Sequence, residues 1–218
     1  MEICHDDQNL YQTNFNHLTK ERFRTTTKVD PQRIWKGFHW SFFINIQGLI
    51  ICLHRFEMSL AVGNIPAAQI ELEAAAQLMM ASGASMKLAG SFSRQEYESQ
   101  VRPTMTPPHV QSNDFSGLMS WEHSWLVKIW KRLQPAFEKL PATLQPEYDK
   151  FVAAYFSLAI AHKAVCEKFG GAETGSLRCD KSTAVEVLDR FGQNRWRLID
   201  PNLKVSNGCP FQRFEAEN

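Results

Sequence analysis

The 218-residue sequence lacks a charge imbalance. Lys and Arg together number 24, Asp and Glu number 23, and the formal net charge at neutral pH is +1. Proteins that bind nucleic acid or an anionic membrane surface need clustered positive charge to neutralise phosphates. The composition therefore argues against nucleic acid and membranes as partners.

The sequence also lacks paired cysteines. Its five cysteines show no CxxC or CxxCH spacing, which argues against a disulfide framework and against a tetrahedral zinc site. The first 30 residues are too polar for a signal peptide. The most apolar window, residues 38–53, is shorter than the ~20 residues that span a bilayer. Together these absences predict a cytoplasmic protein.

Common catalytic signatures are missing as well. The sequence contains no P-loop, no GxGxxG, no HExxH and no nucleophile elbow. A di-iron carboxylate bundle needs Glu-x-x-His pairs on long helices. The only such pair, Glu2 and His5, lies in the polar N-terminal segment, so this class is not supported.

Strand signals are nearly absent, whereas helix signals are dense. The helices expected in chain order cover residues 32–62, 66–88, 93–100, 117–133, 148–169 and 183–199. Pro135 is expected in a connector, and prolines 103, 107 and 108 predict a rigid loop. The sequence thus predicts an all-α bundle of five or six main helices over residues 32–200, between a polar segment (1–31) and a tail (201–218).

His162 and Cys166 lie four residues apart on the apolar stripe of the helix expected over 148–169. Side chains at this spacing share one helix face, with Cβ atoms about 5–6 Å apart. This suits an imidazole that binds a heme iron and a thiol that forms a thioether with a vinyl group at the porphyrin edge. A histidine and a cysteine in such a stripe can equally be ordinary core residues. The pair alone leaves both interpretations open.

Two more histidines and one arginine are candidates. His54 is either a general base in an apolar pocket or an exposed partner of Glu57. His123, between two tryptophans, is a ligand, a propionate partner or a packed polar residue. Arg102, in the proline-rich loop, either holds a carboxylate bidentately or forms a surface ion pair.

Several motifs, taken in order, resemble those of the heme-dependent aromatic oxygenases, the bacterial tyrosine hydroxylases distantly related to tryptophan 2,3-dioxygenase. They are Leu-His-Arg at 53–55, Leu-Met-Met-Ala-Ser-Gly-Ala-Ser-Met at 78–86, Val-Arg-Pro-Thr-Met-Thr-Pro-Pro at 101–108, Phe-Ser-Gly-Leu-Met at 115–119 and Ala-His-Lys-Ala-Val-Cys at 161–166. The resemblance extends over about residues 38–199. It is closest to the branch typified by 3-methyl-tyrosine hydroxylases, whose motif is a His, a long interval and His-x-x-x-Cys.

The resemblance implies an all-α fold that encloses a heme. It also implies that His162 is the proximal iron ligand, Cys166 the single thioether tether, His123 a second heme-side histidine and His54 the distal acid or base. From their chemistry alone, we expect four residues at the substrate: Arg102 for a carboxylate, and Phe115, Ser116 and Trp121 around the ring.

The expected activity is hydroxylation of the ring of L-tyrosine or a methylated tyrosine to a catechol, in natural-product biosynthesis, with peroxide or dioxygen as oxidant. Oxygenation of a tryptophan-like indole is an alternative. Two other classes stay open: a heme sensor or electron carrier with His162 and His123 as axial ligands, and a purely structural helical protein. The sequence leaves open whether the chain forms a homo-oligomer.

Overall fold

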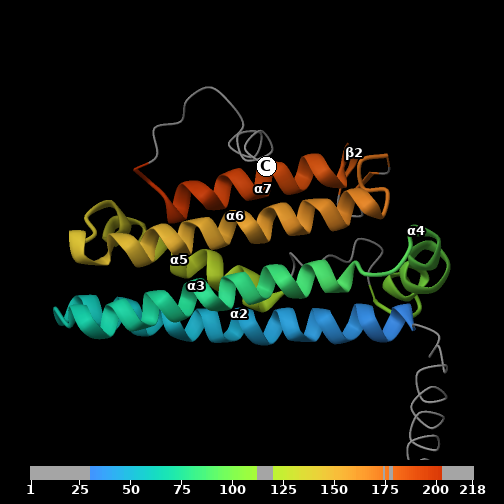
Figure 1. Cartoon of the computed structure of the whole chain (residues 1–218). Helices are drawn as coiled ribbons and strands as arrows, with labels where there is room; N and C mark the ends of the chain where they lie inside the picture. The colour runs from blue at the N-terminus through green and yellow to red at the C-terminus, as the bar shows by residue number, and fades with distance from the viewer. Residues whose placement is uncertain (1–29, 112–119, 174, 177–178, 203–218) are drawn as a thin grey trace, which may run out of the picture. The chain divides into compact units, whose positions relative to one another are not determined.

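The computed structural model describes residues 30–111, 120–173, 175–176 and 179–202 (Figure 1). Its long helices are α2 (Pro31–Ala61), α3 (Ile65–Ala89), α5 (Trp121–Glu138), α6 (Gln145–Lys168) and α7 (Ala184–Ile199). The short elements are α4 (Arg94–Glu96), the π-helical η1 (Tyr97–Val101), the 3₁₀ turns η2 (Arg102–Met105) and η4 (Ala142–Leu144), and the hairpin strands β1 (Gly175–Ser176) and β2 (Cys179–Thr183). The expected all-α bundle is confirmed.

Helix starts follow local capping chemistry. The Asn64 side chain accepts from the backbone N–H of Ala67, next to Pro66 in the first turn of α3. Thr183 and Glu186 form a reciprocal capping box that begins α7. These polar groups satisfy backbone donors that have no partner within the helix. Local sequence therefore fixes where these helices begin.

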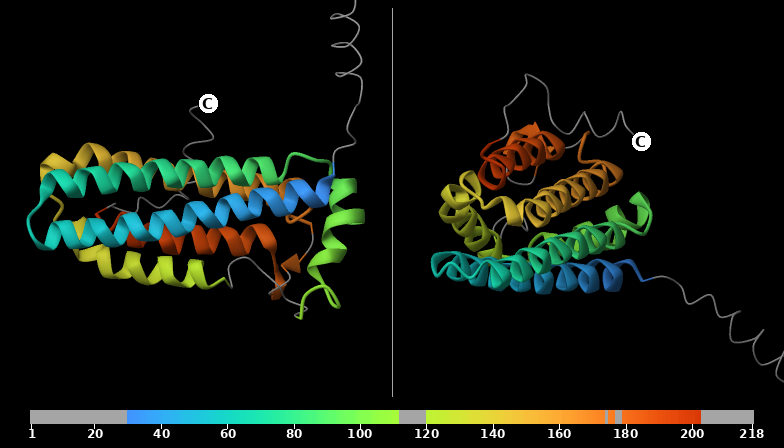
Figure 2. Two further views of the ribbon diagram at one scale, coloured as in Figure 1. Left: turned by 90° about the horizontal axis from the view of Figure 1, so that it is seen from below. Right: turned by 60° about the vertical axis from the view of Figure 1, so that its left-hand side comes forward.

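The five long helices form a closed ring, best seen in the oblique right-hand view of Figure 2. In ring order, α2 packs on α3, α3 on α6, α6 on α7, α7 on α5, and α5 back on α2. The α3–α6 contact is close, because a Cβ atom on Gly83 would lie 3.3 Å from the Cα of Leu158. A ring of amphipathic helices buries its apolar side chains at the centre.

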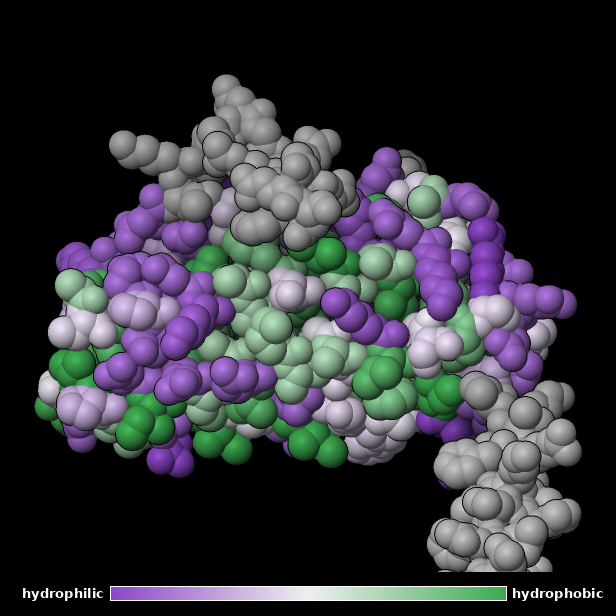
Figure 3. Space-filling view, viewed as in Figure 1, coloured by the Kyte–Doolittle hydropathy of each residue, from purple (hydrophilic) through white to green (hydrophobic). Residues whose placement is uncertain are grey.

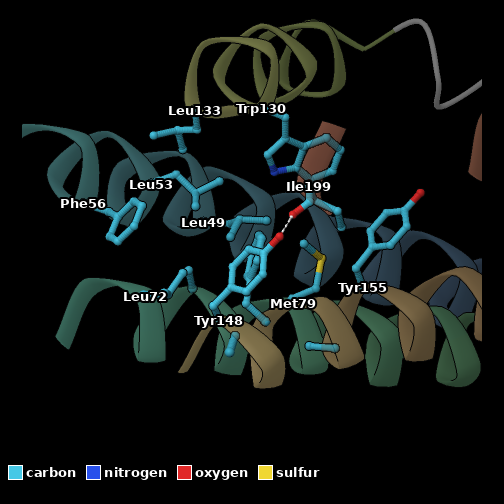
Figure 4. Packing of buried hydrophobic residues seen from close by; sticks show 14 of the residues in the cluster. Leu49, Leu53, Phe56, Leu72, Met79, Trp130, Leu133, Tyr148, Tyr155 and Ile199 are labelled. Carbon is cyan, nitrogen blue, oxygen red and sulfur yellow. Dashed lines mark hydrogen bonds between the residues drawn. The ribbon is translucent and has the colours of Figure 1, made fainter. Parts of the chain in front are cut away.

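The core inside the ring takes residues from all five helices (Figure 4). Leu53 and Phe56 from α2, Leu72 from α3 and Leu133 from α5 are almost fully buried. Tyr148 on α6 donates a hydrogen bond from its hydroxyl to the carbonyl of Ile199 on α7. That bond ties the last helix to the ring.

A second, aromatic cluster closes one end of the ring. Trp35, Phe92, Tyr97 and Phe169 come from α2, the α3–α4 turn, η1 and the end of α6. The Tyr97 ring stacks on Phe169 with centroids 4.3 Å apart and planes 7° apart. Stacked and edge-on aromatic pairs add stabilisation beyond their buried area. This cluster positions η1 and η2 against the end of α6.

Three details differ from the sequence prediction. Pro135 was expected in a connector, but α5 continues through it to Glu138. A proline in a helix interior removes one backbone hydrogen bond and its ring clashes with the preceding turn, which together destabilise the helix by about 3 kcal/mol. The helix persists because Leu133 and Phe137, two residues before and after it, are both buried in the core. The β1–β2 hairpin was not expected, and α6 begins at Gln145, three residues before the expected start at residue 148.

In the described ranges, no helix has both the length and the apolarity that a membrane crossing requires. The apolar window at residues 38–53 is instead the middle part of α2, a bundle helix with one face in the core.

Candidate functional site

Four helices of the ring each contribute one basic side chain to a common group. His39 comes from α2, His162 from α6, His123 from α5 and Arg195 from α7. Charges on His39 and Arg195 both act on His162, and Arg195 donates a hydrogen bond from its guanidinium to Nε2 of His123. We call these four residues the imidazole centre.

His162 is the most strongly perturbed member of the imidazole centre. Burial, then the charge that His39 carries when it is protonated, and then the positive charge of Arg195 lower its pKa from 6.5 to about 4. Burial penalises the charged imidazolium, and neighbouring cations penalise it further. His162 is therefore a neutral imidazole at neutral pH, which is the form that binds metal.

His39 is held in one tautomer by the backbone of its own helix. Its Nδ1 lies 2.7 Å from the carbonyl oxygen of Trp35, one turn earlier, and its ring centroid lies 4.1 Å from the Trp35 ring. A carbonyl only accepts, so Nδ1 donates and Nε2 keeps the lone pair. Burial lowers the pKa of His39, and the hydrogen bond to Trp35 offsets only part of that decrease. His39 thus presents a neutral imidazole with a basic Nε2.

His123 has the opposite tautomer. A guanidinium has only donors, so Nε2 of His123 must accept the hydrogen bond from Arg195, and the ring proton sits on Nδ1. The Arg195 guanidinium lies 4.7 Å from the Phe191 ring centroid and donates to the Phe191 carbonyl at 2.9 Å. Arg195 is therefore fixed by α7 and in turn orients His123.

Cys166 lies one turn after His162 on α6 and is a free thiol. Burial, and then the charge of Glu167, raise its pKa to about 11, so it is protonated at neutral pH. Gly171 packs directly on it, because a Cβ atom there would lie 2.3 Å from Sγ. The chain leaves room for the sulfur only because residue 171 is glycine.

Arg102 reaches the same end of α6. Burial raises the pKa of nearby Tyr97, and the charges of Arg102 and Cys166 also act on that pKa. Arg102 begins the 3₁₀ turn η2 within the proline-containing segment. The structure thus groups Arg102, Tyr97 and Cys166 beside the aromatic cluster.

His54 does not join this group. Its side chain is 59% exposed, and its Nδ1 lies 3.7 Å from one carboxylate oxygen of Glu57. The other oxygen of Glu57 lies 2.6 Å from Nε of Arg132. It follows His39 by 15 residues on the same helix, roughly 22 Å along the axis. The expectation that His54 points into an apolar pocket is therefore wrong. The structure shows the alternative, in which His54 is an exposed partner of Glu57.

The expected substrate residues are placed only in part. Trp121 is 66% exposed and stacks on Trp125 with centroids 5.3 Å apart. It therefore lies on the surface at the start of α5. Phe115 and Ser116 lie outside the described residues.

Sequence analysis missed His39 and Arg195. His39 interrupts the apolar window at residues 38–53, and such an interruption is the local signal that could have marked it. Arg195 carries no local signal, because its partner His123 is 72 residues away.

Within the described residues, no group of three or more His, Cys, Asp and Glu side chains converges to hold a metal ion. The imidazole centre offers separate imidazoles instead. The fold and this site together define an all-α bundle with a partly buried cluster of neutral histidines beside a thiol.

Comparison with known proteins places this bundle in a family. Residues 18–147 match a protein-family model described as SfmD 3-methyl-L-tyrosine peroxygenase, and the chain belongs to that family. It is 30% identical over 184 residues to a "3-methyl-L-tyrosine peroxygenase" of Streptomyces lavendulae, a match that covers 83% of this chain and 50% of the relative. The chain thus spans about half the length of that relative. No solved structure matches.

Proposed function

We propose that this protein is a heme-dependent peroxygenase that hydroxylates the ring of L-tyrosine or a methylated tyrosine to a catechol, in natural-product biosynthesis. The relative of Streptomyces lavendulae is named for 3-methyl-L-tyrosine and for peroxygenase activity, which favours peroxide over dioxygen as the oxidant. Side chains alone cannot oxidise a phenol, so a cofactor must supply the oxidising power.

The observation that carries the proposal is a neutral, partly buried imidazole one helical turn from a thiol. A heme iron takes four ligands from the porphyrin, so the protein needs to supply only one or two imidazoles. His162 is neutral by burial and by the charges around it, and Cys166 is on the same face of α6. The donor set fits a heme better than it fits a bare metal ion.

In this proposal, His162 would hold the iron and Cys166 would hold the porphyrin edge through a thioether. Such a tether would need no oxidant, because the sulfur would go to one vinyl carbon and the thiol hydrogen to the other. The raised pKa of Cys166 keeps the S–H intact until that addition. When bound, heme supplies the iron that activates the peroxide.

We assign the acid–base role to His39 in place of His54. Nε2 of His39 keeps its lone pair, because Nδ1 donates to Trp35. The lowered pKa of His39 means that the ring is neutral and able to take the phenolic proton at neutral pH. His123 is less suited, since its Nε2 already accepts from Arg195.

The amino-acid carboxylate of the substrate is assigned to Arg102. The guanidinium is a bidentate donor, and it lies with Tyr97 near Cys166. Arg102→Ala should weaken substrate binding more than turnover at saturation, because a carboxylate clamp acts in the ground state and transition state alike.

The test uses two matched histidine variants on α2, His39→Phe and His54→Phe. Each purified variant of the 218-residue chain is scored for heme content, for the Soret shift on adding L-tyrosine or 3-methyl-L-tyrosine, and for peroxide-dependent catechol by mass spectrometry. His39→Phe should keep heme and the Soret shift but lose about 10²–10⁴-fold of turnover. His54→Phe should behave as the wild type.

Either of two results would overturn these assignments. Loss of turnover in His54→Phe with normal turnover in His39→Phe would reverse the acid–base assignment. A purified chain that binds no heme would remove the proposed activity itself.

A further inference from the structure

The outer face of α2 carries a line of exposed apolar side chains. Five of them are between 57% and 79% exposed: Trp40, Ile44, Ile51 and Met58 on α2, and Val62 in the turn directly after it. In Figure 3, hydrophobic side chains accordingly appear along the lower edge, where Figure 1 draws α2. We call these five residues the α2 stripe.

The α2 stripe is straight. At 100° per residue, its members lie within about 40° of one line parallel to the helix axis, and they extend over roughly 33 Å. The opposite face of α2 contributes Leu49, Leu53 and Phe56 to the core. A helix that is apolar on two faces is normally buried on both. In the bundle, α3 and α5 cover only the inner side of α2.

The spacing of the α2 stripe is symmetric about its centre. Ile51 lies eleven residues from Trp40 and from Val62, and seven residues from Ile44 and from Met58. In an antiparallel pair of identical helices with Ile51 on a two-fold axis, Trp40 therefore meets Val62 of the other copy, and Ile44 meets Met58. The largest side chain faces the smallest.

The polar neighbours obey the same symmetry. Gln47 and Arg55 are each four residues from Ile51, so they face each other across the axis. Each is already anchored, Gln47 to Glu122 at 3.1 Å and Arg55 to Glu71 at 2.7 Å. Polar residues beside an apolar strip match the usual core and rim of an interface.

The area is sufficient for a stable contact. A large side chain covers on the order of 150–250 Å², so the five exposed fractions amount to roughly 600 Å² per copy. Two copies would bury roughly 1,200 Å², the lower end of the range for specific interfaces. An interface with two-fold symmetry uses the same patch on both subunits.

We propose that a second copy of this chain covers the α2 stripe, and that the two α2 helices pack antiparallel with Ile51 at the two-fold axis. This surface lies on the outside of the ring, and the proposal does not depend on the proposed activity.

Sedimentation velocity on the full chain tests the proposal. The wild type should sediment as a dimer, and Ile51→Lys as a monomer, because two like charges would meet at the axis. Ile70→Lys is the matched control: Ile70 is also exposed but lies on α3, outside the stripe. It should leave the dimer intact. A monomeric wild type, or dimers of equal stability for both variants, would overturn the proposal.

Cross-linking tests the register. In a background with Cys52→Ser, Ile51→Cys should form a disulfide with its own copy under mild oxidation, since both copies bring residue 51 to the axis. Val62→Cys should stay at the background level, because its neighbour is Trp40 of the other copy. Equal cross-linking of both variants would exclude the antiparallel arrangement.

Discussion

The pH dependence of folding stability should report directly on His162. Its pKa is about 4 in the fold and 6.5 ordinarily, so the unfolded chain binds this proton more readily than the folded chain. Stability is then fully present above pH 6.5 and is lost as the pH falls toward 4. Iron binding also requires a neutral imidazole, so bound heme leaves the sign unchanged.

The magnitude follows from the difference between the two pKa values. A difference of about 2.5 corresponds to about 3 kcal/mol once the pH is below 4. Between pH 7 and pH 5, the free energy of unfolding falls by about 2 kcal/mol through His162 alone. For a chain of this size, that lowers the melting temperature by about 4–8 °C.

The assay compares thermal unfolding of wild type, His162→Gln and His54→Gln at pH 7 and pH 5. His39 also has a lowered pKa and contributes in the same direction, so the informative quantity is the difference between variants. His162→Gln should lose about 2 kcal/mol of the pH dependence, whereas His54→Gln, on the exposed face, should keep it. A His162→Gln protein with the full wild-type pH dependence would refute the placement of His162 in the imidazole centre.

Two further substitutions test the surroundings of that centre. Gly171→Ala should destabilise the fold by about 1–3 kcal/mol in chemical denaturation, because its Cβ would overlap Sγ and backbone atoms of Cys166. The control Gly37→Ala, which has no atom within 4 Å of the new Cβ, should stabilise the fold by up to about 1 kcal/mol. An unchanged free energy of unfolding in Gly171→Ala would contradict the packing of Gly171 on Cys166. Arg195→Met should raise the pKa of His162 as measured by NMR titration, since one of the cations that lower it is removed, and an unchanged pKa would show that Arg195 is not near.

Helix positions were predictable because the signals are local. Capping boxes and apolar spacing involve residues within one or two turns, and the Thr183–Glu186 box begins α7 as expected. Pro135 was misjudged because its cost is offset by long-range packing of Leu133 and Phe137, which no local pattern contains. The burial of these two side chains in the core therefore sets the end of α5 at Glu138.

The candidate site divides in the same way. His162 and Cys166 share a face of one helix, so their spacing alone placed them together. His39 and Arg195 meet them only because α2 and α7 occupy the same ring. The misplacement of His54 has a specific cause: α2 is apolar on two faces, and periodicity cannot tell which of them faces the core.

Extraction of the purified protein with acidified organic solvent tests the central claim most directly. If His162 binds a heme and Cys166 tethers it, heme absorbance should stay with the wild-type polypeptide, and the intact mass should equal chain plus heme. Cys166→Ala should bind heme through His162 but release it on extraction. Heme that leaves the wild-type chain freely, or a chain isolated without any heme, would contradict the account.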